Sequence, residues 1–169
     1  PEIAAAWERG DIDATFVWDP VLAKVKQKGK VIATSGSIAQ MGFPTFEGVV
    51  VTNKFAQENP EFMVAFVKAL NRASAQVRDN LGKWTPESTE VKAIAKWCKA
   101  DPKDVPAAMA LYKFPSAEEQ LGAQWLGGGA AKAMTNTAAF LKSQGRIQEV
   151  KPDYAAFVTD VYVKKALGK

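Results

Sequence analysis

The sequence predicts an α/β fold in which three strands are followed mostly by helices. In the first third of the chain, short segments rich in β-branched and aromatic residues alternate with helical segments. Beyond Asn53, helix-capping signals recur and apolar residues repeat at spacings of three and four. The 169 residues are 47% hydrophobic and 24% charged, a globular balance that predicts a packed core. The length fits one domain or one piece of a larger protein.

The N-terminal region begins with a helix and then a strand. Residues 2–9 are rich in alanine and predict a helix that ends at Gly10, a residue suited to a left-handed helix cap. A short strand is expected over residues 13–18. Asp19-Pro20 then has the pattern of an N-cap followed by proline at the first helical position, which predicts that a helix starts there.

Two further strands complete the α/β pattern. The helix over residues 21–28 precedes a strand over residues 31–34, and a third strand over residues 46–52 follows a bend at residues 42–44. Strands separated by helical segments of this length favour parallel pairing in one sheet.

The remainder of the chain is predicted to be helical. Helix starts are indicated at four places: Asn59-Pro60, Thr85-Pro86, Asp101-Pro102, and Ser116 with Glu119 as a capping box. Two more helices are expected over residues 130–142 and 153–167. Three strands followed by this many helices leave strand partners absent, so we infer that further strands lie upstream of this sequence.

The composition excludes several classes of chemistry. The chain has no histidine, and Cys98 is its only cysteine, so imidazole catalysis, intrachain disulfides and cysteine zinc sites are excluded. The net charge of +4 is spread along helical segments rather than clustered, so we expect no nucleic-acid partner. No cofactor or metal is implied, and no apolar run reaches the length of a membrane span. Because the chain begins with Pro1, we expect a processed product or a fragment.

Two residues are candidate ligand contacts. Glu47 lies in a strongly apolar predicted strand, where a carboxylate must be solvated, paired or facing a ligand. Trp18 stands at the carboxyl end of a predicted strand, where ligands bind in parallel sheets, although its position fits a core residue equally well. Asp19 is a conceivable partner for Glu47, but the neighbouring Pro20 favours a capping role.

Other conspicuous residues favour structural interpretations. The glycines at 127–129 are not preceded by a strand, so they indicate a turn between helices rather than a phosphate-binding loop. Trp7, Trp97 and Trp125 lie on predicted helices among apolar residues and are expected to pack. No pairing of a nucleophile with a base stands out.

The sequence resembles the periplasmic taurine-binding proteins of taurine ABC transporters. Its more specific motifs are A-W-x-R-G-D-I-D-A at Ala6 to Ala14, V-W-x-P at Val17 to Pro20 and G-x-P-T at Gly42 to Thr45. The resemblance extends over nearly the whole chain. Alkanesulfonate, nitrate and thiamine-precursor binders share the general pattern, so the superfamily is better specified than the ligand.

This resemblance implies the C-terminal portion of a two-lobed type II periplasmic binding protein. Residues 1–40 would belong to the second lobe, residues 41–46 would cross the hinge, and residues 47–169 would complete the first lobe. Such a protein is expected to act in the periplasm as a monomer, to capture a small solute between its lobes, and to deliver it to a membrane permease without chemical change.

The resemblance also implies roles for three residues. Glu47 would receive the ammonium group of the ligand, Trp18 would be a pocket tryptophan, and Thr45 would be a helper contact. The sulfonate would bind in the absent part of the protein. The alternatives are a binder of another solute of this superfamily, an enzyme on the same scaffold, and the effector domain of a transcription regulator.

Overall fold

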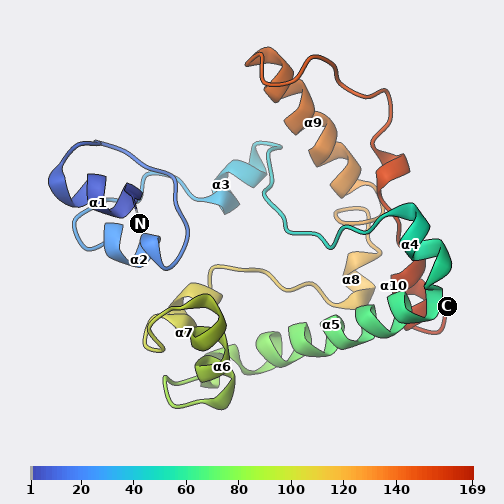
Figure 1. Ribbon diagram of the computed structural model, residues 1–169, viewed down its shortest axis with the longest axis horizontal. Helices are drawn as coiled ribbons and strands as arrows, with labels where there is room; N and C mark the ends of the chain where they lie inside the picture. The colour runs from blue at the N-terminus through green and yellow to red at the C-terminus, as the bar shows by residue number, and fades with distance from the viewer. Residues whose placement is uncertain (1) are drawn as a thin grey trace. The chain divides into compact units, whose positions relative to one another are not determined.

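The computed structural model describes residues 2–169, and its regular elements are all helical (Figure 1). The chain forms two compact units, the first made of Pro1–Ile32 with Gln76–Phe114 and the second of Ala33–Ala75 with Pro115–Lys169. The expected division into lobes at residues 1–40, 41–46 and 47–169 refers to lobes completed outside this sequence, and it stays a prediction.

The prediction of an α/β fold with three strands is wrong for the described residues. The segments at 13–18, 31–34 and 46–52 are irregular, and no β-ladder is found within residues 2–169. A strand exists only when its backbone N–H and C=O groups pair with a neighbouring segment, and no such pairing joins these three segments. Their β-branched and aromatic composition favours strands, but composition cannot supply the partner.

Within the described residues, the first unit contains four short α-helices, a 3₁₀ turn and the last residues (76–80) of a long helix that begins in the second unit. Its elements are α1 (Glu2–Arg9), α2 (Val21–Val25), η1 (Leu81–Lys83), α6 (Thr89–Cys98) and α7 (Val105–Met109). Helix α1 has the predicted bounds, and Gly10 follows it with a φ of 77°, in the left-handed region. Trp7 of α1 packs so closely on Gly29, just beyond α2, that a Cβ on Gly29 would lie 2.9 Å from the indole ring.

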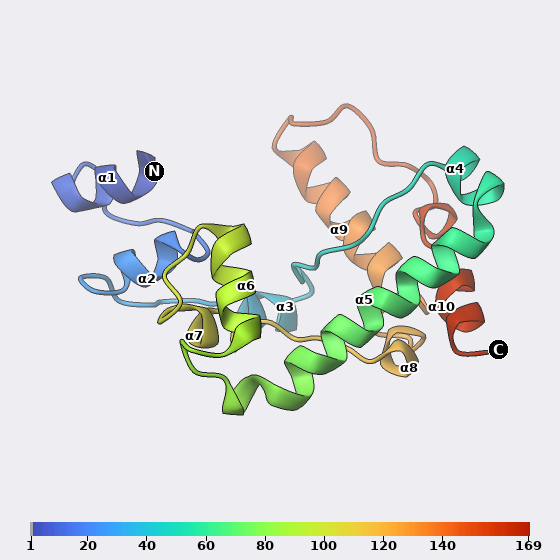
Figure 2. The same ribbon diagram turned by 60° about the horizontal axis from the view of Figure 1, so that its bottom comes forward.

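The best-buried core of the first unit lies between α6 and α7, which pack on each other (Figure 2). Val91, Ala95 and Val105 are buried there. Four partly buried side chains close the cluster: Trp84, Ile94, Ala100 and Met109. The spacing of four between Val91 and Ala95 puts both on one face of α6, so a helix of ten residues can bury an apolar stripe.

The prediction that Trp97 packs against apolar residues is wrong. Trp7 and Trp125 are half-buried, as expected, but Trp97 is 82% exposed. Two residues along a helix correspond to a rotation of roughly 200°, so the face that buries Ala95 turns Trp97 outward. The Lys96 ammonium lies 5.9 Å from the centre of the Trp97 ring.

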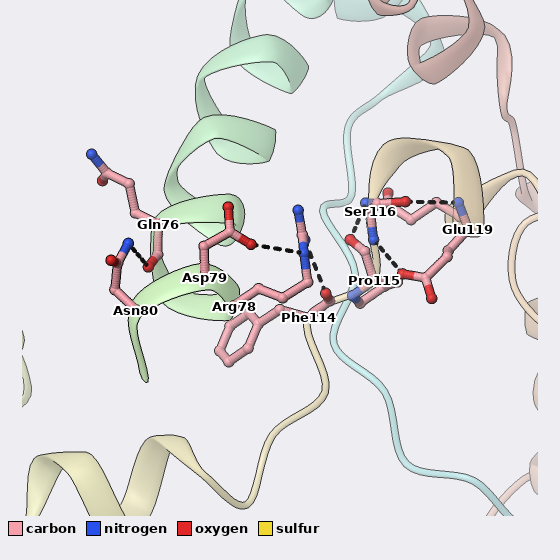
Figure 3. A network of polar contacts seen from close by, with 9 residues as sticks. Gln76, Arg78, Asp79, Asn80, Phe114, Pro115, Ser116 and Glu119 are labelled. Atoms are coloured by element: carbon pink, nitrogen blue, oxygen red, sulfur yellow. Dashed lines mark hydrogen bonds and ion pairs between the residues drawn. The ribbon is translucent and has the colours of Figure 1, made fainter. Parts of the chain in front are cut away.

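Helix α5 (Pro60–Asn80) is the longest element and begins at the predicted Asn59-Pro60 signal. Near its C-terminal end, Arg78 donates from Nη1 to the Phe114 carbonyl at 3.2 Å (Figure 3). Its Nε also lies 3.7 Å from an Asp79 carboxylate oxygen. The bond to Phe114 connects the end of α5 to the last residue of the first unit.

The second unit contains the remaining helices. These are α3 (Ser35–Gln40), α4 (Asn53–Glu58), α8 (Ala117–Gln120), α9 (Gly129–Ser143), η2 (Ala155–Phe157) and α10 (Val161–Ala166), together with the first part of α5. The helix predicted over residues 153–167 is thus divided into η2 and α10.

Local signals account for the region around α8. As predicted, Ser116 and Glu119 form a capping box, in which Ser116 Oγ accepts from the Glu119 N–H at 3.1 Å (Figure 3). The Ser116 N–H donates back to Glu119 Oε2 at 2.7 Å. Gly127 and Gly128 lie in the predicted turn, and Gly129 is the first residue of α9. A Cβ on Gly129 would overlap the Gln124 carbonyl, so this position requires glycine.

Candidate functional site

Trp18 lies in the first unit, immediately before the turn that opens α2. Its backbone carbonyl accepts from the Leu22 N–H at 3.0 Å. The neighbouring Asp19 carboxylate accepts from the Ala23 N–H at 3.1 Å, but the N-cap residue of α2 is Pro20 and not Asp19, the residue that the sequence had predicted. These bonds hold the backbone, while the Trp18 side chain is 70% exposed. The indole therefore presents an open aromatic face from a fixed position on the backbone.

Glu47 and Thr45 lie in the second unit, on the irregular segment between α3 and α4. We call residues 42–52 the linking segment (Figure 1). Both side chains are exposed. Among the described residues, neither takes part in a hydrogen bond or ion pair, so the carboxylate and the hydroxyl remain available to a ligand. Thr45 and Glu47 are two residues apart on this segment.

The start of the linking segment is fixed by a contact across the sequence. Asn136 of α9 donates from Nδ2 to the Gly42 carbonyl at 3.0 Å. Gly42 has a φ of 95°, a backbone conformation that favours glycine, and it turns the chain out of α3. The N–H groups of Gly42 and Phe43 donate to the Ala39 and Ile38 carbonyls of α3 at 3.0 and 3.3 Å.

The far end of the linking segment is fixed by α4. Thr52 Oγ1 accepts from the Phe55 N–H at 3.2 Å and caps that helix. Tyr162 of α10 donates its hydroxyl to the Ala56 carbonyl at 3.1 Å, which attaches α4 to α10. Between these anchors, no backbone group of residues 44–51 is hydrogen-bonded within the part of the chain that the structure describes. The segment that carries Thr45 and Glu47 is thus held at its ends and free in its middle.

Asn136 is the residue of this site that sequence reasoning missed. It lies in the interior of α9, where asparagine is an ordinary surface residue of modest helix propensity. No motif or spacing connects it with Gly42, which is 94 positions away. Asn136 and Gly42 become neighbours only through the fold of the second unit.

A second surface feature lies between the start of α5 and α10. It is an open, mainly apolar depression, with Glu61, Lys68 and Lys165 among its lining residues. It is wholly within the second unit and holds none of the predicted site residues. In the described part of the chain, no group of three or more carboxylate or cysteine side chains could hold a metal ion. No helix there combines the length and hydropathy that crossing a bilayer requires.

Comparison with known proteins gives a consistent result. The sequence model of a family described as "Substrate binding domain of ABC-type glycine betaine transport system" matches residues 1–100. The taurine-binding periplasmic protein of Escherichia coli (strain K12) is 34% identical over 97% of this chain and 51% of its own length. A putative aliphatic sulfonates-binding protein of Bacillus subtilis (strain 168) is 30% identical over 56% of this chain and 28% of its own length. The chain therefore spans about half, or less, of the length of these relatives.

Proposed function

This chain belongs to the family of substrate-binding domains of ABC-type glycine betaine transport systems, and on this basis we propose that it is part of the solute-binding component of an ABC importer. The solute is taurine or a similar aminosulfonate. The observation that carries this proposal is the 34% identity with a taurine-binding protein across 97% of the chain.

The chemistry of the three candidate residues supports this choice of solute. Taurine carries an ammonium group at one end and a sulfonate at the other. The exposed Glu47 carboxylate is suited to the ammonium, because a charge-assisted hydrogen bond is stronger than a neutral one. The open face of Trp18, in the first unit, is by itself suited to contact a cation. The Thr45 hydroxyl, two residues before Glu47, can donate or accept a further hydrogen bond.

The setting of this activity follows from the same proposal. The protein works in the periplasm, binds its solute as a monomer without changing it, and passes it to the permease of the transporter. The name of the Escherichia coli relative and the transport family support this setting. Residues 1–40, 41–46 and 47–169 then contribute to the second lobe, the hinge crossing and the first lobe.

A second candidate solute is an aliphatic sulfonate without an amino group. The identity of 30% with a putative aliphatic sulfonates-binding protein favours it. The position of Glu47 opposes it, because a carboxylate next to such a ligand would add a negative charge without a cation to balance it. The two solutes are therefore distinguished by whether Glu47 strengthens or weakens binding.

Calorimetry on the full mature protein that contains these residues would test the proposal. We expect taurine to bind more tightly than ethanesulfonate, which lacks the ammonium group, and than glycine betaine, whose quaternary ammonium cannot donate a hydrogen bond. Glu47→Ala should weaken taurine binding and leave ethanesulfonate binding unchanged or improved. If taurine does not bind, or if Glu47→Ala leaves its affinity unchanged, the proposed solute or the proposed role of Glu47 is wrong.

A further inference from the structure

Asn136 makes a contact that joins the linking segment to a distant helix. Its side-chain amide donates to the Gly42 carbonyl at 3.0 Å, across 94 positions of sequence. The other hydrogen bonds of Met41, Gly42 and Phe43 all return to α3, to Ile38 and Ala39. Among the described residues, Asn136 thus supplies the one hydrogen bond that connects residues 41–51 to an element other than α3.

The geometry of Gly42 makes this contact directional. With a φ of 95°, Gly42 turns its carbonyl away from the course of α3 and toward α9. A Cβ on Gly42 would lie 3.9 Å from Asn136 Nδ2, so the two groups are in ordinary contact rather than compressed. The carbonyl can only accept, so the amide nitrogen must face it. A carboxylate at position 136 would place an oxygen against that carbonyl.

We propose that Asn136 is a positioning residue that fixes the start of the linking segment and thereby sets where Thr45 and Glu47 meet the ligand. This rests on the proposed function. Thr45 is three residues beyond Gly42 and Glu47 is five beyond it, and within residues 2–169 no backbone hydrogen bond of residues 44–51 lies between the anchor and these two side chains. The Asn136–Gly42 bond is therefore the described contact that best defines the direction in which the segment leaves α3. Asn136 acts through the segment and does not touch the solute.

The first experiment requires no ligand. Amide hydrogen exchange would be measured at Gly42 and Phe43 in the full mature protein, in Asn136→Ala and in Asn136→Asp. Exchange should be faster in both variants and fastest with aspartate, because the partially negative Gly42 carbonyl oxygen would then face a negative carboxylate oxygen. Asn71→Ala is the matched control, since Asn71 is also half-buried within a helix and its side chain forms no hydrogen bond with the described residues. Unchanged exchange in both Asn136 variants would overturn the proposal.

The second experiment separates positioning from general support of the fold. Affinities for taurine and ethanesulfonate would be measured by calorimetry for the original protein, Asn136→Ala, Glu47→Ala and the double variant. Loss of one hydrogen bond is expected to weaken taurine binding about tenfold, and to weaken ethanesulfonate binding less, because ethanesulfonate has no ammonium group for Glu47. In the Glu47→Ala background, Asn136→Ala should have little further effect on taurine.

Each outcome has a defined meaning. Equal losses for both ligands, or an undiminished Asn136 effect without Glu47, would show a merely structural role and overturn the proposal. If the unsubstituted protein bound neither sulfonate, the proposed function would fail, and the ligand-positioning role would fail with it. The exchange experiment would then still report whether Asn136 fixes the turn, so the two failures remain distinguishable.

Discussion

Two valines of this protein differ fully in their exposure to solvent. Val91, in α6 of the first unit, is fully buried at 0% exposure, whereas Val50, in the linking segment of the second unit, is 93% exposed. Their side chains are identical, so the difference lies in the backbone that carries them. Helix α6 satisfies its own backbone hydrogen bonds and buries its apolar stripe against residues close in sequence. Residues 44–51 of the linking segment make no backbone hydrogen bond within residues 2–169, and none of these residues is buried.

This contrast separates a self-supporting region from one that depends on distant contacts. The self-supporting region, residues 84–109, builds a small core from two short helices and their flanks. The linking segment is held at Gly42 and Thr52 and carries the candidate ligand contacts Thr45 and Glu47. Segments with few backbone bonds and few buried contacts open most readily, and binding elements are often drawn from them.

The largest expected effect comes from placing a carboxylate at each valine. Val91→Asp should lower the free energy of unfolding by several kcal/mol, because it buries a charge without a partner. Val50→Asp should change it by less than about 0.5 kcal/mol, as is usual for an exposed position. Urea denaturation of both variants would measure the difference. Similar losses in the two variants would contradict the exposure of Val50.

The next effect concerns the ligand. Glu47→Gln keeps the shape of the side chain and removes its charge, so taurine affinity should fall about tenfold to a hundredfold, corresponding to about 1.4 to 2.8 kcal/mol. The urea midpoint should not move, because Glu47 forms no ion pair with the described residues. Calorimetry and denaturation together would test this separation of binding from stability. A lowered urea midpoint would assign Glu47 a structural role instead.

A smaller effect is expected where a local signal sets the structure of the second unit. Ser116→Ala removes the acceptor for the Glu119 N–H and should cost about 1 kcal/mol of stability. Ser116→Asp, which restores an acceptor at the N-cap, should recover most of it. The urea midpoints of the two variants would measure these changes in stability. Equal losses of stability in both variants would show that the capping bond contributes little.

The smallest effect concerns a turn before α7. The pKa of the Asp101 carboxyl is held below its usual range, first by the hydrogen bond from the Lys103 N–H and then by the bond from the Lys103 ammonium. A depressed pKa stabilises the fold above the ordinary carboxyl pKa of about 4, and this contribution is lost as pH falls through the folded value. Asp101→Asn should therefore be slightly less stable than the original at pH 7, and the gap should narrow at low pH. Because Asp101 is exposed, the gap should be small. A gap that is unchanged at low pH would exclude this carboxyl as its source.

The same contrast explains what could be predicted from the sequence. The helix over residues 2–9, the start of α5 at Pro60 and the capping box of Ser116 with Glu119 were predictable, because each depends on residues within a few positions. The absence of strands among the described residues was not predictable, because composition does not reveal whether a segment has a neighbouring strand to pair with. Family membership was predictable from motifs, since the segment from Ala6 to Ala14 is specific in sequence.

The candidate site was predictable only in part. Ligand-binding roles for Glu47 and Trp18 stay predictions from residue type and resemblance, and both residues are exposed in the structure. Asn136 could not be inferred, because its bond to Gly42 depends on the path of the whole second unit. The glycine and proline at residues 42–44 indicated a turn there. They did not indicate that the Asn136 side chain anchors it.

The exposed middle of the linking segment also affects the colloidal behaviour of the protein. Residues 46–51 combine an aromatic ring and three consecutive valines with a backbone that makes no hydrogen bond to the other described residues, and Glu47 is their single charge. Such a stretch is prone to self-assembly into cross-β aggregates, and a charged side chain within it acts as a gatekeeper. Light scattering should therefore show that Glu47→Gln shortens the time for which a concentrated solution stays clear. One carboxylate would then serve two purposes, recognition of a cation and solubility of the segment that presents it.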